Sequence, residues 1–379
     1  MGRPIRILHL SNQAGPLYLF SLPIFQGLRD AGFEVDLACM TMGPLYPPLA
    51  EQPYRLHGLT PGARLNPWTW LRARREVRRL LRRERYDLMV VHTPLMSWAA
   101  RPVARGLVGK VVYLAHGLAY APVQRPLSYR ILRGIERHMA RYTDAVITMN
   151  DEDERQAAAG RLTRAGAGCY RVNGEGVDVH EWTSPPSAEE TAELEQRLNL
   201  RPGRPMILFM GRFIVEKRPF DVIETARRLD DRADVVMAGD GPLWEQTRRQ
   251  AEALGPHVHV TRFTHQTRAL VYRSSVQLLP SVWPEGMPRV LLETQLACRP
   301  PVAYDVRGSQ DAIVHERTGL LVPPRDVSAF ADAVKRLLDD DEYRRALGEA
   351  GRERVRENYA WEVVAPQHVD IVRKVLEQS

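Results

Sequence analysis

The first half of the chain alternates short apolar runs with longer amphipathic segments. Residues 5–10 (IRILHL) form an apolar run, and a pattern with Leu22, Phe25 and Leu28 follows before it stops at Gly32. Such runs are typical of buried parallel strands, and the spacing of three to four residues indicates a helix. Further strands are predicted at residues 34–40, 88–91, 111–114 and 145–149, and a further helix at residues 127–142.

The same alternation restarts after a segment rich in proline at residues 183–186. Strands are predicted at residues 206–210, 235–238, 257–260, 276–279 and 302–304, with helices at 219–229, 243–254, 288–298, 328–338, 342–358 and 361–378. Strands separated by helices predict an α/β fold with doubly wound parallel sheets, which bind ligands at the carboxyl ends of the strands.

A chain of 379 residues suits two such domains. We predict an N-terminal Rossmann-like domain over residues 1–183 and a C-terminal Rossmann-like domain over residues 184–360, facing each other across a cleft. A final helix over residues 361–379 is expected to cross back to the N-terminal domain.

The composition is that of a globular protein, with 44% hydrophobic and 7% aromatic residues. The three cysteines, Cys39, Cys169 and Cys298, lie far apart and have neither disulfide-like nor metal-ligand spacing. No secretory leader opens the sequence, and no apolar run approaches the length of a membrane span. A cytoplasmic protein is therefore expected.

The formal net charge of +7 is concentrated in one segment, Trp70 to Arg85, where eight arginines surround a narrow apolar stripe. This pattern predicts a basic amphipathic helix. The helix is either a solvated outer helix of its domain or a contact for an anionic membrane surface, which would place the protein at the inner face of the membrane. No basic motif interleaved with aromatic residues and no zinc-finger spacing supports binding to nucleic acid.

Residues 280–293 (PSVWPEGMPRVLLE) place two carboxylates around the start of one predicted helix. Glu285 lies in the loop before the helix, and Glu293 lies on a helix face with Arg289 and Val290, which we expect to be covered. A covered carboxylate needs donors. The partner of Glu293 is either Arg289 one turn back or the hydroxyl groups of a ligand whose phosphate binds at the helix start.

Two further predicted strands are followed by residues that could bind a ligand. Gly211, Arg212, Lys217 and Arg218 lie between a predicted strand and helix, where three cations oppose the helix dipole unless an anion such as a diphosphate binds among them. The alternative is that these basic side chains point into water. His116 follows the strand at residues 111–114, and it is either a structural residue or part of a ligand site.

The spacing of Glu285 and Glu293, the Gly-Arg and Lys of the loop at 211–217, and the Gly-Asp-Gly-Pro at 239–242 resemble the retaining family-4 glycosyltransferases of the GT-B fold. Segments at 173–178, 305–309 and 318–326 look like the bacterial members that assemble lipid-linked oligosaccharides, capsules and exopolysaccharides. The resemblance implies that the catalytic residues are His116, Arg212, Lys217 and Glu285, and that the donor-binding residues are Gly15, Gly211, Gly239, Thr264, Gly286, Met287, Arg289, Val290 and Glu293. His265 and Pro288 depart from it, since glycine is usual at both positions.

The implied activity is transfer of a hexose from a nucleoside-diphosphate sugar, most often a UDP-sugar, to a glycan, a lipid-linked or a small-molecule acceptor. The resemblance implies retention of the anomeric configuration, with the nucleotide sugar as co-substrate and no metal or other cofactor. Two alternatives remain open: a nucleotide-sugar epimerase of the same architecture, and a non-catalytic module that binds nucleotide sugars or membranes.

Overall fold

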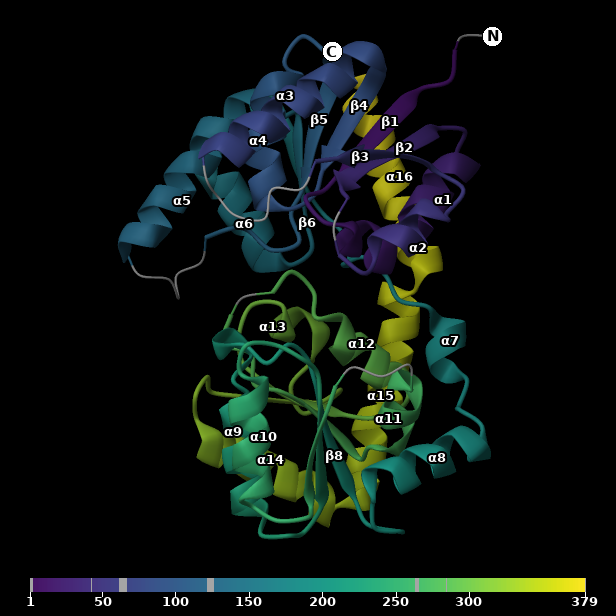
Figure 1. The fold of residues 1–379 in the computed structure, drawn as a ribbon, viewed down its shortest axis with the longest axis vertical. Coiled ribbons are helices and arrows are strands. Elements are labelled where there is room, and N and C mark those ends of the chain that lie inside the picture. The colour runs from purple at the N-terminus through teal and green to yellow at the C-terminus, as the bar shows by residue number, and fades with distance from the viewer. Residues whose placement is uncertain are drawn as a thin grey trace. The chain divides into compact units, whose positions relative to one another are not determined.

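The computed structural model describes residues 3–41, 43–60, 67–120, 126–262, 266–283 and 285–378 (Figure 1). Contacts within the chain divide it into two units, of which the first comprises Met1–Gly176 with Trp361–Ser379 and the second comprises Val177–Ala360. The division falls at Gly176, before the proline-rich segment at 183–186 where we placed the boundary. The final helix belongs to the first unit.

The first unit is built on a parallel seven-stranded sheet with the order β3-β2-β1-β4-β5-β6-β7. The order reverses between β1 and β4, so the carboxyl ends of these two strands form the switch point at which doubly wound sheets bind ligands. The strands are β1 (Arg6–Leu10), β2 (Glu34–Met40), β3 (Arg55–Leu59), β4 (Tyr86–Val91), β5 (Val108–Leu114), β6 (Ala145–Thr148) and β7 (Gly168–Arg171).

Helices cover both faces of this sheet because its central strands are apolar on both sides. Helix α1 packs against α16, α3 packs against α4, and α4 packs against α5. The helical elements are η1 (Pro16–Phe20), α1 (Leu22–Asp30), α2 (Tyr46–Ala50), α3 (Pro67–Arg83), α4 (Pro94–Ala104), α5 (Pro126–Met139), η2 (Ala140–Tyr142), α6 (Asp151–Gly160) and α16 (Trp361–Glu377).

The second unit contains a parallel six-stranded sheet with the order β10-β9-β8-β11-β12-β13. Its strands are β8 (Met206–Met210), β9 (Asp234–Ala238), β10 (Val258–Thr261), β11 (Val276–Leu279), β12 (Pro301–Tyr304) and β13 (Leu320–Val322). Its helices are α7 (Val179–Thr183), α8 (Ala188–Leu198), η3 (Val215–Lys217), α9 (Pro219–Leu229), α10 (Trp244–Glu252), α11 (Thr267–Arg273), α12 (Arg289–Leu296), α13 (Ser309–Ala312), α14 (Val327–Asp339) and α15 (Asp341–Tyr359). Both units are therefore doubly wound, as the alternation of strands and helices predicts.

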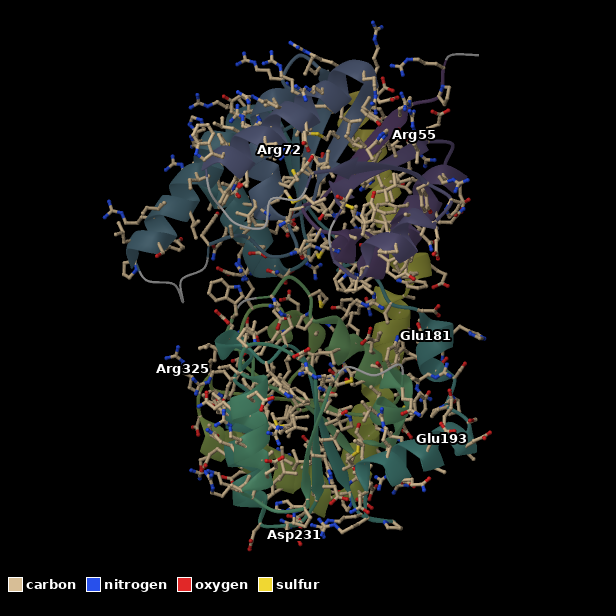
Figure 2. The ribbon with its side chains drawn as sticks, in the orientation of Figure 1. Arg55, Arg72, Glu181, Glu193, Asp231 and Arg325 are labelled. Carbon is tan, nitrogen blue, oxygen red and sulfur yellow. The ribbon has the colours of Figure 1, made fainter. Side chains whose placement is uncertain are left out.

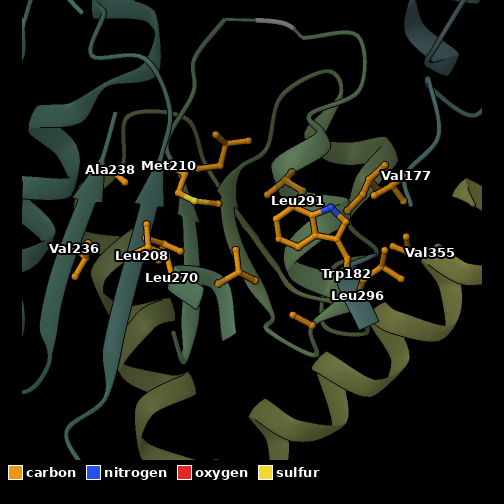
Figure 3. Close-up of a cluster of buried hydrophobic side chains, with 14 of the residues drawn as sticks. Val177, Trp182, Leu208, Met210, Val236, Ala238, Leu270, Leu291, Leu296 and Val355 are labelled. Carbon is orange, nitrogen blue, oxygen red and sulfur yellow. The ribbon is translucent and has the colours of Figure 1, made fainter. Parts of the chain in front are cut away.

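Two apolar clusters hold this second sheet, one on each face. Leu208 of β8 belongs to the cluster that Trp182 and Leu291 complete (Figure 3), while its neighbour Phe209 belongs to the opposite cluster with Phe330. Successive side chains of a strand point to opposite faces, so a run of apolar residues such as β8 serves both clusters. This packing fixes the carboxyl end of β8, where the loop with Lys217 begins.

Helix α3 buries a narrow apolar stripe, as the sequence pattern predicts. Ala73, Val77, Leu80 and Leu81 are buried, while Trp70 is only partly buried and carries the guanidinium of Arg74 4.5 Å above its ring. The opposite face is solvent-exposed, and Arg72 on it is labelled in Figure 2. The same helix exposes Trp68 and Leu71, with 81% and 40% of their surfaces accessible.

A fully buried ion pair joins helices α4 and α5. Arg101 donates to Glu136 at 2.7 Å, and neither side chain is accessible to solvent. Glu136 also accepts from the indole N–H of Trp98 at 2.7 Å, and Arg101 also donates to Thr143 at 3.1 Å. Each charge therefore has several hydrogen-bond partners, which is the condition under which a buried pair is tolerated.

We predict that Arg101→Met destabilises the first unit by about 3–5 kcal/mol, because the carboxylate of Glu136 stays buried without its cation. Urea unfolding of the full chain measures the loss. In the matched double variant Arg101→Met/Glu136→Leu no charge is left behind, so most of the loss should be recovered. A single-variant loss below about 1 kcal/mol, the value of a surface pair, would show that the interaction does not stabilise the unit.

Candidate functional site

The loop after β8 lies against the loop that precedes α12. The backbone N–H of Val282 donates to the carbonyl of Glu216 at 3.0 Å, which joins the two loops. This contact places Lys217 beside Glu285, with the ammonium nitrogen 2.5 Å from a carboxylate oxygen. The side chains are 21% and 25% exposed, so the pair lies at the surface of the second unit and is accessible to a ligand.

The other two cations of this loop differ in their surroundings. Arg212 is exposed, and within the described ranges its side chain forms no ion pair. Arg218 binds Asp221 in the first turn of its own helix, with contacts of 2.7 and 2.9 Å. Our expectation that three cations oppose the dipole of α9 is therefore wrong for Arg218, because the protein supplies its anion. Lys217 likewise has an anion of the protein beside it, Glu285, so within the described ranges Arg212 is the cation of this loop whose side chain forms no ion pair.

The glycines after β9 allow two loops of the protein to touch. A side chain at Gly239 would place its Cβ 1.8 Å from the carbonyl oxygen of Gly211, and one at Gly241 would lie 2.6 Å from the carbonyl oxygen of Phe213. The resemblance places Gly239 among the donor-binding residues. The described structure instead shows the loop after β8 filling that space, so Gly239 acts on the site by holding Gly211 in place.

Helix α12 begins one residue later than predicted. Pro288 is the N-cap with extended backbone angles, and Arg289 is the first helical residue. The helix ends at Leu296 rather than near Cys298, which adopts a left-handed backbone conformation at φ 56°.

The local partner that we considered for Glu293 is present. Arg289 lies 3.2 Å from Glu293 one turn away, and both side chains are about 15% exposed. Burial raises the pKa of Glu293, and the positive charge of Arg289 opposes that rise.

The remaining predicted residues around the start of α12 are buried or partly buried. Gly286 is buried and Met287 and Val290 are partly buried. The backbone at Gly308 approaches the carbonyl of Glu285 so closely that an added Cβ would lie 2.7 Å from that oxygen. Thr264 and His265 lie outside the described residues.

In the first unit, His116 follows β5 at the carboxyl edge of the sheet and has a neighbour on each ring nitrogen. Its Nε2 atom lies 3.0 Å from Nδ1 of His92, and its Nδ1 atom pairs with the carboxylate of Glu175. His92 in turn lies 3.0 Å from His9 of β1. The sequence pattern singled out His116 as a residue that follows a strand but gave no role to His9 or Glu175, because neither has a distinctive local motif.

Gly15 precedes the π-helix η1 and has helical backbone angles of −51° and −54°. A Cβ at this position would meet only Leu45, at 3.6 Å, so the described fold does not itself require glycine there. Among the described residues, no group of three or more His, Cys, Asp or Glu side chains has the arrangement of a metal site. Every helix that the structure describes is too short or too polar to cross a bilayer.

Two family models match the chain, one in each half. Residues 21–166 match the glycosyl transferase 4-like domain, and residues 190–354 match the glycosyl transferases group 1. The two matches together cover most of both units.

Curated relatives align over most of their lengths. The putative glycosyltransferase EpsD of Bacillus subtilis (strain 168) is 27% identical over 343 residues, which is 88% of this chain and 87% of that protein. A UDP-Gal:alpha-D-GlcNAc-diphosphoundecaprenol alpha-1,3-galactosyltransferase of Escherichia coli is 24% identical over 84% of each chain.

Solved structures share the fold. Anabaena Alr3699/HepE in complex with UDP-glucose superposes with a TM-score of 0.82 at 17% identity, over 98% of this chain and all of that one. The arrangement of two parallel-sheet Rossmann-like domains is thus that of the GT-B fold.

We predict that Gly239→Ala destabilises the second unit by about 1–3 kcal/mol, because the added methyl group must displace the backbone of Gly211. Thermal unfolding measures the loss, and titration with a nucleoside diphosphate should show weaker binding. Gly134→Ala is the matched control, since its Cβ meets no atom within 4 Å and alanine favours a helix by about 1 kcal/mol. Wild-type stability of Gly239→Ala would contradict the close approach of the two loops.

Proposed function

Because this chain belongs to the group 1 glycosyl transferases, we propose that it transfers a sugar from a UDP-sugar to a glycan or lipid-linked acceptor with retention of anomeric configuration. The observation that carries the proposal is the contact between Lys217 and Glu285, at 2.5 Å, in a loop that also carries the exposed Arg212. The UDP-galactose in the name of the Escherichia coli relative and the UDP-glucose bound to the Anabaena protein support a uridine nucleotide.

The donor diphosphate is proposed to replace Glu285 as the partner of Lys217. When the sugar leaves, negative charge grows on the β-phosphate, and a cation already in place stabilises the transition state more than the bound donor. Arg212 supplies a second cation. The amino end of α12 at Arg289 and Val290 adds the positive end of a helix dipole.

Released from Lys217, Glu285 is proposed to accept hydrogen bonds from sugar hydroxyl groups. The backbone of Gly286 and Met287 would orient the same sugar, and Glu293, paired with Arg289, would bind the ribose. Each of the two carboxylates thus has a binding role and neither is assigned as a nucleophile. Attack of the acceptor on the face that the diphosphate leaves is the retaining route that fits these roles.

The acceptor is proposed to be lipid-linked and to lie at the inner face of a membrane. The diphosphoundecaprenol in the name of the Escherichia coli relative supports such an acceptor. In the first unit, the exposed Trp68 and Leu71 of α3 offer apolar contacts next to a row of exposed arginines. This combination of apolar and basic side chains on one helix fits an anionic membrane surface better than a purely solvated face.

We predict that Lys217→Ala lowers kcat by roughly 10²- to 10³-fold, because the lost cation stabilises charge that grows during the reaction. Glu285→Gln should also depress transfer, since an amide accepts hydrogen bonds from sugar hydroxyl groups more weakly than a carboxylate does. Initial rates with UDP-sugars measure both effects, and Lys335→Ala, which removes a lysine from α14, is the matched control. Wild-type rates in both folded variants would place the active site elsewhere and favour a binding module.

Turnover should survive a strong chelator, because Lys217 and Arg212 supply positive charge at the site of the leaving diphosphate. The measurement compares transfer rates before and after dialysis against the chelator. A metal-dependent glycosyltransferase treated in parallel serves as the control and should lose its activity. Loss of activity in the present protein, restored by magnesium or manganese, would contradict metal-independent transfer.

Charge reversal on α3, with Arg75, Arg79 and Arg82 changed to Glu, should release the protein from anionic vesicles while leaving donor hydrolysis intact. The expected loss is roughly 1 kcal/mol for each basic residue near the surface. Vesicle co-sedimentation measures it. The matched control reverses three exposed arginines of the second unit, Arg325, Arg345 and Arg356, and should sediment like the wild type. Equal sedimentation of both triple variants would return α3 to the role of a solvated outer helix.

A further inference from the structure

Three histidines from three adjacent strands of the first unit form a continuous chain. His9 lies within β1, His92 directly follows β4, and His116 follows β5. Nδ1 of His9 is 3.0 Å from Nε2 of His92, and Nδ1 of His92 is 3.0 Å from Nε2 of His116. The carboxylate of Glu175 pairs with Nδ1 of His116 and closes the chain at one end.

The row of three histidines is buried except for the ring of His116. His9 is 2% exposed, His92 is fully buried and Glu175 is 7% exposed, while the side chain of His116 is 21% exposed. Burial lowers the pKa of His9 to about 3 and that of His92 well below its usual value. His368 of α16 also faces the chain, and burial lowers its pKa to about 4. The two inner rings are therefore neutral at ordinary pH.

If all three histidines are neutral, their contacts allow only one arrangement of the ring protons. A contact between two ring nitrogens needs one N–H and one lone pair, and a carboxylate can only accept. His116 therefore carries its proton on Nδ1, toward Glu175, and its Nε2 atom must accept. His92 must then donate from Nδ1 and accept at Nε2 from His9, so all three rings carry their proton on Nδ1.

A second proton on His116 would reverse the direction of each hydrogen bond between the histidines. Its Nε2–H would donate to Nδ1 of His92, which would move the proton of His92 to Nε2 and that of His9 to Nε2 as well. Nε2 of His9 is buried and has no hydrogen-bond partner among the described residues. A buried N–H without an acceptor is unfavourable, so the chain resists protonation of its exposed end.

We propose that His92 and His9 are positioning residues that hold the ring of His116 neutral, with its proton on Nδ1 and its plane fixed between His92 and Glu175. The bearing of this arrangement on transfer rests on the proposed function. With both ring nitrogens engaged, His116 presents its ring edge and backbone to a ligand and does not exchange protons with it. Transfer then stays independent of histidine titration through the neutral pH range.

The first experiment reads the tautomers directly and does not depend on activity. Long-range proton–nitrogen NMR of the full chain labelled with ¹⁵N-histidine distinguishes the Nδ1–H, Nε2–H and doubly protonated rings. His9, His92 and His116, assigned by single substitution, are expected in the Nδ1–H form between about pH 5 and pH 8. An Nε2–H or doubly protonated His116 in the wild type within that range would overturn the proposal.

The second experiment changes the donor that His116 requires. His92→Phe removes it, whereas His92→Asn places an amide N–H near the position of the lost Nδ1–H and should rescue. In His92→Phe, His116 takes up a second proton beside Glu175. The pH profile of kcat/KM should therefore gain an acidic limb that approaches about tenfold per pH unit, while His92→Asn keeps the wild-type profile.

These variants separate positioning from stability. If His92 were only structural, both substitutions would lower the melting temperature and neither would change the pH profile or the tautomer of His116, which would overturn the proposal. His92→Gln replaces His92→Phe if the latter does not fold, because its amide reaches toward His9 and not toward His116. Absence of transferase activity in the wild type would refute the proposed function alone, since the tautomers are still measured by NMR.

Discussion

The ion pair between Lys217 and Glu285 is the contact on which the site of the second unit depends. It joins the loop after β8 to the loop before α12, and the hydrogen bond from Val282 to Glu216 supports the same junction. A cation and an anion at 21% and 25% exposure satisfy each other without a ligand, yet both stay accessible. A ligand that carries phosphates and hydroxyl groups offers each of them a new partner, so one contact prepares both halves of the proposed donor site.

Close packing elsewhere in each unit keeps these groups in place. In the second unit, Gly239 lets the β9 loop touch Gly211, and the pairing of Arg218 with Asp221 fixes the start of α9. In the first unit, the row of contacts from His9 to Glu175 does the same for His116, through ring nitrogens and a carboxylate instead of apolar packing. Both sites lie where parallel strands end, and there the buried strands provide a rigid base for exposed loops.

The sequence predicted the central strands well because they are apolar on both faces. The expected bounds at 34–40, 206–210 and 276–279 coincide with β2, β8 and β11. The strands β3 and β7 at the two edges of the first sheet were missed, since half-exposed residues such as those of β7 give no apolar run. The candidate residues in the loop after β8 and in the loop before α12 were found from sequence motifs. The contact of Lys217 with Glu285 and the place of His9 in a chain depend on tertiary structure, which no local pattern encodes.

The most direct test of this account is the affinity for UDP in a double-mutant cycle of Lys217→Met and Glu285→Gln, measured by titration calorimetry. If the diphosphate replaces Glu285 as the partner of Lys217, Glu285→Gln should tighten UDP binding in the wild-type background, because the lysine no longer has a competing anion. That gain should vanish when Lys217 is absent, which gives a coupling energy of about 0.5–3 kcal/mol between the two positions. Additive effects of the two substitutions, or weaker UDP binding in Glu285→Gln, would contradict the exchange of partners.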